Sequence, residues 1–493
     1  MIAAHLPALQ VVIPLLAAPL CAILRRGTIA WVIAVVANWL AFAVSIGLLF
    51  RVLDEGVISY AMGGWAPPIG IEYRVDLINV FVLLVVSGVG AVIIPFARAG
   101  TAGRFDSTNQ AWFYTMYLLA LTGLLGVTIT GDAFNIFVFL EVSSLASYVM
   151  IAMGRDKRAL TAAYQYLIMG TVGATFIVIG VGLLWAMTGT LNLYDLAQRI
   201  PDIENTRPVL AALAFLTVGI SLKLALFPLH LWLPNAYAYA PAVASAFLAG
   251  TATKVGIYLL LRFFFTVFGG EGFFLSTPLP EVFLVLSVVA IFAASTVAVF
   301  QNNLKRMFAY SSVAQIGFIT LGISYATETG LTAALVHLMN HAIMKAGIFM
   351  LLGCVIYRLA SMRIDDLAGI GRKMPFTTAG IVILGLGLLG VPGTSGFISK
   401  WWLVLAALEN GQWWLVALIV IASLITMIYV GRFVEAAYFR EPSEKAMNVR
   451  EAPLAMLIPS YVLVAATIYL GFDTTWSVGL ALDAAASLLS AAY

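Results

Sequence analysis

Four lysines and one glutamate lie in the middle of long apolar stretches, where an unpaired charge is costly. They are Glu141, Lys223, Lys254, Lys345 and Lys400. A charged side chain at the centre of a membrane helix costs about 2.5–3.5 kcal/mol on insertion scales. We therefore expect these residues to face one another or water inside a bundle, as in a path for ions or protons. The alternative for any single lysine is that it only ties neighbouring helices together.

Two of these lysines stand beside sequences that interrupt a helix. Lys223 precedes Pro228, which lacks a backbone donor and clashes with the preceding turn. Lys400 follows a glycine-rich stretch that contains Pro392 and Gly393. Broken helices free backbone carbonyls and admit water, as at the ion sites of transporters. The sequence thus predicts two broken helices at a translocation site.

Two histidines and a lysine recur on one helical stripe, since His337, His341 and Lys345 are each four positions apart. A neutral imidazole both donates and accepts hydrogen bonds, and it titrates near pH 6.5, which suits proton transfer. The alternative is that both histidines are bonded to backbone in a tight bundle. A zinc protease motif is excluded because Leu338 occupies its glutamate position. We expect no metal, no catalytic residue and no cofactor.

The elements that must position these residues are membrane helices. Of the 493 residues, 62% are hydrophobic and 10% are charged, whereas a soluble domain has about 25% charged residues. This composition excludes soluble enzymes and nucleic-acid binders. At roughly 20 residues per span, the apolar runs predict an all-α polytopic membrane protein with about 14 transmembrane helices. The runs are 7–24, 29–50, 76–97, 111–129, 132–153, 162–187, 208–229, 240–265, 281–300, 307–325, 330–357, 376–404, 413–438 and 453–472.

The two interrupted runs are the seventh and the twelfth, which predicts two inverted five-helix repeats, each with a broken helix. An odd number of helices in each repeat gives the second copy the opposite orientation. The predicted units are N-terminal helices 1–3 (1–110), the first repeat with helices 4–8 (111–265), the second repeat with helices 9–13 (281–438), and helix 14 with a tail or interfacial helix (439–493).

The basic residues predict the orientation. Most of the 26 Lys and Arg residues follow odd-numbered runs, and few follow even-numbered ones (Arg51, Arg74, Arg199, Arg207 and Arg262). Loops rich in Lys and Arg face the cytoplasm. We therefore expect both termini on the outer side.

Several motifs resemble the antiporter-like subunits of respiratory complex I, membrane-bound hydrogenases and Mrp-type cation/proton antiporters. The longest is KLALFPLHLWLPNAYAYAPAVASAFLAGTATKVGIY at 223–258, and others lie at 303–317, 340–345 and 396–401. The segment 63–71, GGWAPPIGI, most resembles the D-type subunits of the Mrp antiporters. The resemblance covers nearly the whole chain.

The resemblance implies a proton-translocating subunit of a multisubunit Na⁺ (or K⁺)/H⁺ antiporter in the inner (plasma) membrane of a prokaryotic cell. It implies other antiporter subunits as partners and no nucleic acid. By this resemblance Glu141 pairs with Lys223, Lys254 is the bridging lysine, and Lys400 belongs to the second broken helix. The expected path runs from Glu141/Lys223 through Lys254 and the stripe of His337, His341 and Lys345 to Lys400.

Three alternatives remain. The chain could be a proton-pumping subunit of complex I or of a related membrane-bound hydrogenase. It could be a membrane enzyme that acts on lipid, although no acid–base or metal site near an interface is recognisable in the sequence. It could also be a purely structural subunit, in which case the buried lysines would be dispensable for transport.

Overall fold

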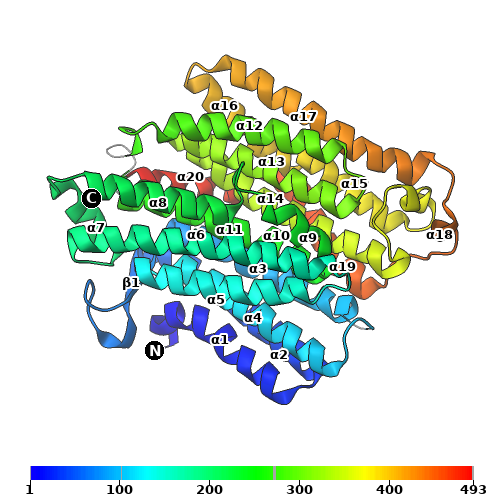
Figure 1. Cartoon of the computed structure of the whole chain (residues 1–493), viewed down its shortest axis with the longest axis horizontal. Helices are drawn as coiled ribbons and strands as arrows, with labels where there is room; N and C mark the ends of the chain where they lie inside the picture. The colour runs from blue at the N-terminus through cyan, green and yellow to red at the C-terminus, as the bar shows by residue number, and fades with distance from the viewer. Residues whose placement is uncertain (1, 102, 270–273, 491–493) are drawn as a thin grey trace.

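The protein is described here by a computed structural model that covers residues 2–101, 103–269 and 274–490. Helices run side by side along the long axis of the molecule (Figure 1). The first half contains α1 (Leu6–Leu24), α2 (Gly27–Glu55), α3 (Leu77–Thr101), α4 (Ser107–Ile129), α5 (Ala133–Ala152), α6 (Arg158–Thr188), α7 (Leu193–Arg199), α8 (Arg207–Leu224), α9 (Trp232–Tyr239), α10 (Ala242–Gly250) and α11 (Ala252–Leu261). The second half contains α12 (Leu279–Val299), α13 (Leu304–Ser324), α14 (Glu328–Leu359), α15 (Pro375–Leu389), α16 (Ser395–Glu409), α17 (Trp413–Val434), α18 (Glu444–Met447), α19 (Leu454–Phe472) and α20 (Thr475–Ser490).

Smaller elements join these helices. An antiparallel hairpin of β1 (Ile58–Ala61) and β2 (Glu72–Val75) connects α2 to α3. Single 3₁₀ turns occupy Ile2–His5, Met62–Gly64, Ile200–Asp202, Asp365–Leu367 and Ile370–Arg372, and π-helical turns occupy Arg262–Val267 and Glu435–Phe439.

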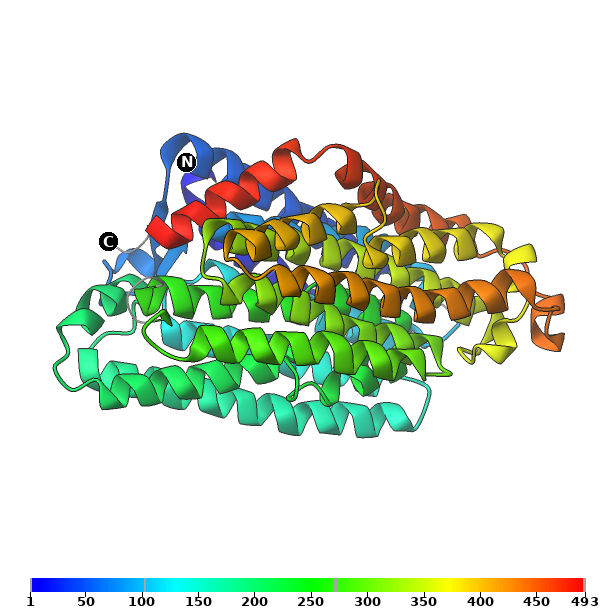
Figure 2. The same ribbon diagram turned by 90° about the horizontal axis from the view of Figure 1, so that it is seen from above.

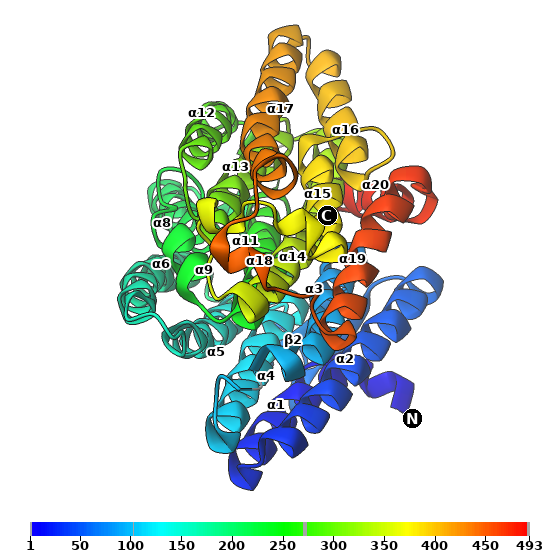
Figure 3. The ribbon, with the colours of Figure 1, turned by 90° about the vertical axis from the view of Figure 1, so that its right-hand side faces the viewer.

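The predicted membrane-spanning architecture is confirmed. Within the described residues, 13 helices are long and apolar enough to cross a membrane, or up to 14 if a bent pair at 365–389 counts as one span. The central element is α14, which packs against α3, α10, α13, α15, α16, α19 and α20. Figure 3, which looks along the helices, shows it surrounded by the rest of the bundle. The stripe of His337, His341 and Lys345 therefore lies in the middle of the protein.

Two matching backbone bridges support the predicted inverted repeats. Asp132 pairs with Asn192, and Asn303 pairs with Arg363, so the two bridges join residues that are equally far apart in the sequence. The side chains of Asp132 and Asn303 also cap the helices that follow, α5 and α13. These helices begin at opposite ends of the molecule, α5 at the left of Figure 1 and α13 at the right. The same local design thus occurs twice in opposite orientations.

The broken helices also occur twice. The first half of each ends on a left-handed residue, Ala225 (φ 61°) after α8 and Gly390 (φ 85°) after α15. Pro228 lies between α8 and α9, and Pro392 and Gly393 lie between α15 and α16. The run over 376–404 is therefore divided into two helices, as the sequence predicts.

The helix expected over 240–265 is also interrupted. It divides into α10 and α11 at Thr251, whose φ and ψ are −127° and −55°. The run contains no proline in its interior, so this break has no strong signal in the sequence. It matters because Lys254 follows it by three residues.

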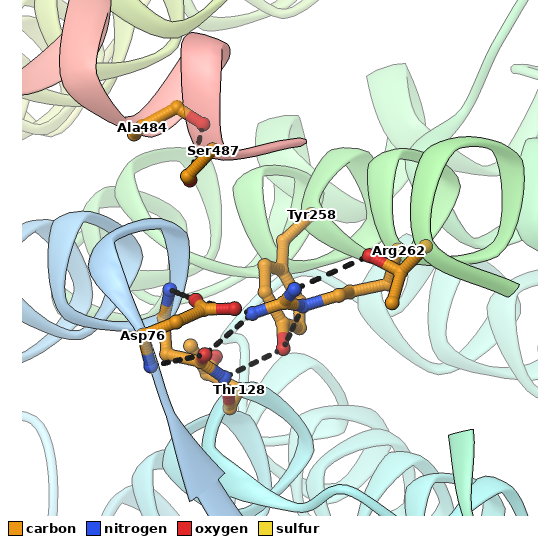
Figure 4. Close-up of polar contacts among 8 residues, drawn as sticks. Asp76, Thr128, Tyr258, Arg262, Ala484 and Ser487 are labelled. Carbon is orange, nitrogen blue, oxygen red and sulfur yellow. Dashed lines mark hydrogen bonds and ion pairs between the residues drawn. The ribbon is translucent and has the colours of Figure 1, made fainter. Parts of the chain in front are cut away.

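The charge count grouped Arg262 with the loop residues, although it lies near the end of the expected run 240–265, and the structure shows that it is buried. It lies in the π-helical turn after α11 and is 4% exposed. Its guanidinium donates to Asp76 Oδ1 at 2.5 Å and to the Tyr258 hydroxyl at 3.1 Å (Figure 4). Counting basic residues along the sequence could not show that Arg262 is buried, because its partner Asp76 lies just before α3, far away in the sequence.

The segment expected as a tail or an interfacial helix contains a helix, α20. It follows α19 along one side of the bundle and ends at the same end as the start of the chain (Figure 2). Both helices pack against α3 and α14. The shared end of the two termini agrees with an even number of membrane crossings.

A close backbone contact holds the second broken helix together. A Cβ atom on Gly396 would lie 1.8 Å from the carbonyl oxygen of Gly387. Because that oxygen belongs to the backbone, no side chain could move to make room. Glycine is therefore required where α16 crosses α15.

Replacing Arg262 with glutamine should destabilise the protein strongly. Asp76 would remain as a buried carboxylate without its cation, and breaking such a pair costs about 3–5 kcal/mol. The measurement is the midpoint of thermal unfolding in detergent. Arg440→Gln is the control, because Arg440 pairs with Glu435 on the surface and is 43% exposed. Equal shifts in the two variants would contradict a special role for the buried pair.

Gly396→Ala should also lower the unfolding midpoint, because α15 and α16 must separate to accommodate a methyl group. Overpacking of this kind costs about 1–3 kcal/mol. The matched control is Gly431→Ala in α17, where an added Cβ meets nothing within 4 Å. If both variants have the same unfolding midpoint, the close crossing of α15 and α16 does not limit the packing of the bundle.

Candidate functional site

The predicted pair of Glu141 and Lys223 is present. Lys223 Nζ lies 3.2 Å from Glu141 Oε1 and donates to the Ser144 hydroxyl at 3.0 Å. The lysine side chain is 5% exposed and the glutamate 24%. Because Ser144 is three residues after Glu141, both acceptors lie on one face of α5. The ammonium thus lies between a charged acceptor and a neutral one.

The first helix break places Lys223 at this position. It is the penultimate residue of α8, and the chain leaves the helix at Ala225. One carbonyl near the end of α8 is satisfied from the next segment, because the Trp232 indole donates to Leu222 O at 2.9 Å. The break is therefore a packed structure with paired backbone groups.

Lys254 lies beside the unexpected break in the next span. It is completely buried, and its ammonium donates to the Ala249 carbonyl and to the Thr253 hydroxyl. Among the described residues, no carboxylate forms an ion pair with it. The break at Thr251 thus supplies an acceptor from the backbone.

The stripe on α14 is buried as well, and its three members have different surroundings. His337 Nδ1 lies 2.7 Å from Ser399 Oγ, and its Nε2 lies 2.9 Å from Gln315 Oε1. This arrangement joins α14 to α13 and α16. The His341 ring is nearly parallel to that of His337, with 6.3 Å between the ring centroids.

His341 differs because neither of its ring nitrogens has a hydrogen-bond partner in the described part of the chain, although the residue is fully buried. Lys345, one turn further on, donates to the Phe308 carbonyl at 2.9 Å and to the Ser311 hydroxyl.

Lys400 occupies the second broken helix. Its Nζ donates to the carbonyls of Leu388 and Leu389 at 3.0 and 2.9 Å, and to Ser423 Oγ at 2.8 Å. The two carbonyls belong to the last turn of α15, so no N–H group of a following helical turn donates to them. The ammonium also lies 4.8 Å from the centre of the Phe318 ring. Lys400 is thus held by the break itself.

Of the seven residues that the sequence suggested for proton transfer, the structure pairs two and places the other five at buried positions of the bundle. Glu141 and Lys223 are the pair, and the other five are Lys254, His337, His341, Lys345 and Lys400. The polar side chains that position them were missed from the sequence, and they are Ser311, Gln315, Ser399 and Ser423. Ser311 and Gln315 are four residues apart, so they lie on one face of a helix, and both belong to the motif at 303–317. This spacing is the signal in the sequence that could have identified them.

Known proteins share this architecture. Residues 130–426 match the protein family described as NADH:quinone oxidoreductase/Mrp antiporter, transmembrane. The chain is 40% identical to the N-type subunit of an NADH-quinone oxidoreductase from Desulforudis audaxviator, over 95% of this chain and 96% of that protein. It is 31% identical to the D-type subunit of a Na(+)/H(+) antiporter from Alkalihalophilus pseudofirmus, over 87% and 86%.

A solved structure agrees with these relatives. A chain of the Mrp complex from Dietzia sp. superposes with a TM-score of 0.90 at 25% identity, covering 99% of this chain and 98% of that one. These matches confirm the resemblance found in the motifs. The chain belongs to the family of transmembrane subunits that NADH:quinone oxidoreductases and Mrp antiporters share.

Proposed function

We propose that this chain is the proton-translocating subunit of a multisubunit Na⁺ (or K⁺)/H⁺ antiporter. Protons pass along Glu141/Lys223, Lys254, the α14 stripe of His337, His341 and Lys345, and Lys400. The observation that carries the proposal is the ion pair of Lys223 and Glu141, 3.2 Å apart beside a helix break within the membrane-spanning bundle.

The pair acts as a switch because Lys223 has two acceptors of different charge. Near Glu141 the lysine is held in its charged form, since an opposite charge at about 4 Å contributes about 4 kcal/mol at an effective dielectric constant of 20. If the ammonium moves away from Glu141, that stabilisation is lost while the cost of burial remains. The lysine then releases its proton toward Lys254.

The middle of the path requires water. A buried polar group almost always has a partner in the protein or an ordered water. The two unpartnered nitrogens of His341 therefore favour water molecules between Lys254 and Lys345. Water and a neutral imidazole both donate and accept, so they can pass a proton between lysines that do not touch.

Lys400 is suited to the end of the path by its neutral acceptors. Two carbonyls and a hydroxyl stabilise its ammonium. Because none of them carries a net charge, the lysine can lose its proton without leaving an unpaired carboxylate behind. The same holds for Lys254 and Lys345.

The position of Glu141 supports the proposal that this chain has partner subunits. Phe134, Val138, Leu145 and Val149 form an exposed apolar stripe on α5, and the partly exposed Glu141 lies beside it. A carboxylate facing lipid would be costly. A neighbouring subunit that covers this face of α5 would remove the cost.

A second candidate is a proton-pumping subunit of an NADH-quinone oxidoreductase, favoured by the 40% identity to the N-type subunit of such an enzyme. The proton path is the same in both cases, and the partner chains differ. Gentle purification of the full chain with its companions distinguishes them. Small membrane subunits would support the antiporter, whereas flavin and iron–sulfur proteins would support the second candidate.

Glu141→Ala and Lys223→Ala should each nearly abolish transport without preventing assembly, since each variant removes a group that holds or releases the proton on the proposed path. The assay is cation-dependent proton movement in proteoliposomes that contain the whole complex. Glu281→Ala and Lys373→Ala are controls, because both residues are exposed near helix ends. Unchanged transport in either site variant would refute the mechanism.

Lys223→Arg separates charge from proton release. An arginine can still pair with Glu141, but it does not deprotonate in proteins. We expect the complex to assemble normally and transport to be lost nearly as fully as with alanine. Transport near the unmodified level would show that the position needs only a positive charge.

A further inference from the structure

A basic pocket of about 300 Å³ lies outside the proposed proton path. It is formed where the loops after α3 and α5, the joint of α9 and α10, the start of α13 and the end of α14 meet, at the end of the bundle that faces the viewer in Figure 3. Its charged lining consists of one carboxylate and five cations: Asp156, Arg104, Arg155, Arg158, Lys305 and Arg363.

The single carboxylate is already paired. Asp156 lies 2.5 Å from Arg158, which leaves no free acidic group in the lining. Arg363 has only a distant and exposed partner, Asp365 at 4.0 Å. The pocket therefore carries a large positive excess.

The other three cations have no carboxylate partner among the described residues. Arg155 donates to the Gly103 carbonyl at 2.8 Å, and Lys305, 2% exposed, donates to the Ala240 carbonyl at 2.8 Å. Burial, and then the neighbouring charge of Arg155, lowers the pKa of Arg104. Like charges gathered at a partly buried site repel one another unless an anion lies between them.

The remaining walls indicate what kind of anion fits. Pro241, Ile356 and Met362 contribute apolar surface beside the cations. The pocket lies at the ends of helices that are long and apolar enough to span a membrane. A phosphate with an attached apolar part matches both sides of this lining better than a small free anion does.

We propose that this pocket binds the phosphate of an anionic phospholipid. Arginine holds phosphate oxygens through paired hydrogen bonds, and Arg104 and Arg155 are the groups most free to do so. This end of the bundle also carries most of the Lys and Arg residues, and basic pockets between helices at a cytoplasmic end suit acidic headgroups.

The site would connect the two repeats. The first repeat contributes Arg155 and Arg158, and the loop before it contributes Arg104. The second repeat contributes Lys305 and Arg363. Lys305 also contacts the end of α9, the second part of the first broken helix. A bound phosphate would therefore stabilise the junction of α9 with α13.

The test uses the full chain, purified in detergent with its companion subunits and stripped of lipid. Thermal stability is titrated with phosphatidylglycerol, with phosphatidylcholine and with inorganic phosphate. We expect stabilisation by phosphatidylglycerol above that by phosphatidylcholine. In Arg104→Gln/Arg155→Gln the half-saturating concentration should rise at least roughly tenfold, since one charge-assisted hydrogen bond is worth about that factor.

The matched control is Arg372→Gln/Lys373→Gln, which removes two exposed charges at the same end of the bundle. It should bind phosphatidylglycerol like the unmodified protein. Stabilisation by inorganic phosphate alone that is lost in Arg104→Gln/Arg155→Gln would support the phosphate site and identify a free anion as its occupant. Unchanged binding in that variant, or equal effects of both phospholipids with none of phosphate, would overturn the proposal.

Discussion

The structure depends on one constraint, which is that an ammonium group inside a membrane bundle must have acceptors. Continuous helices offer almost none, because each carbonyl is already bonded within its own helix. The chain meets the constraint at Lys223, Lys254 and Lys400 by interrupting helices beside them, whereas Lys345 bonds the Phe308 carbonyl and the Ser311 hydroxyl of the continuous helix α13. Lys400 bonds the last carbonyls of α15, and Lys254 bonds a carbonyl at the break after α10. Only Lys223, among the lysines of the proposed path, has a carboxylate partner in the described residues. The breaks and the buried charges are therefore parts of one arrangement.

Inverted duplication explains why the breaks come in pairs. The bridges Asp132–Asn192 and Asn303–Arg363 occupy equivalent positions in the two repeats and lie at opposite ends of the bundle. Each repeat then contributes one helix broken at a proline, and the first repeat has a further break at Thr251. Each repeat ends in a π-helical turn, at Arg262–Val267 and Glu435–Phe439. The copies have diverged in their polar content. The first pairs its lysine with Glu141, whereas the second surrounds its lysine with carbonyls and Ser423. A path through both repeats is thus asymmetric, which directional transfer requires.

Relatives named for two different assemblies match nearly the whole chain, one at 40% identity and one at 31%. What they share with this protein is one family of transmembrane subunits, and the family match at 130–426 covers most of the bundle. The partly exposed Glu141 on an apolar face of α5 lies at the edge of that bundle.

The sequence by itself determined the membrane class, the buried lysines and the two proline-containing breaks, because apolar runs, their charged exceptions and Pro228 or Pro392 act locally. It also predicted the inverted repeats from the spacing of those breaks. Only the tertiary structure decided how each charge is satisfied. The break at Thr251 has no local signal, and Arg262 reads as a loop residue until α3 brings Asp76 within 2.5 Å of it. His341 reads like His337, yet only His337 meets Gln315 and Ser399. The physical reason is that a hydrogen bond or ion pair depends on distances of a few ångströms between residues remote in sequence, and packing alone sets those distances.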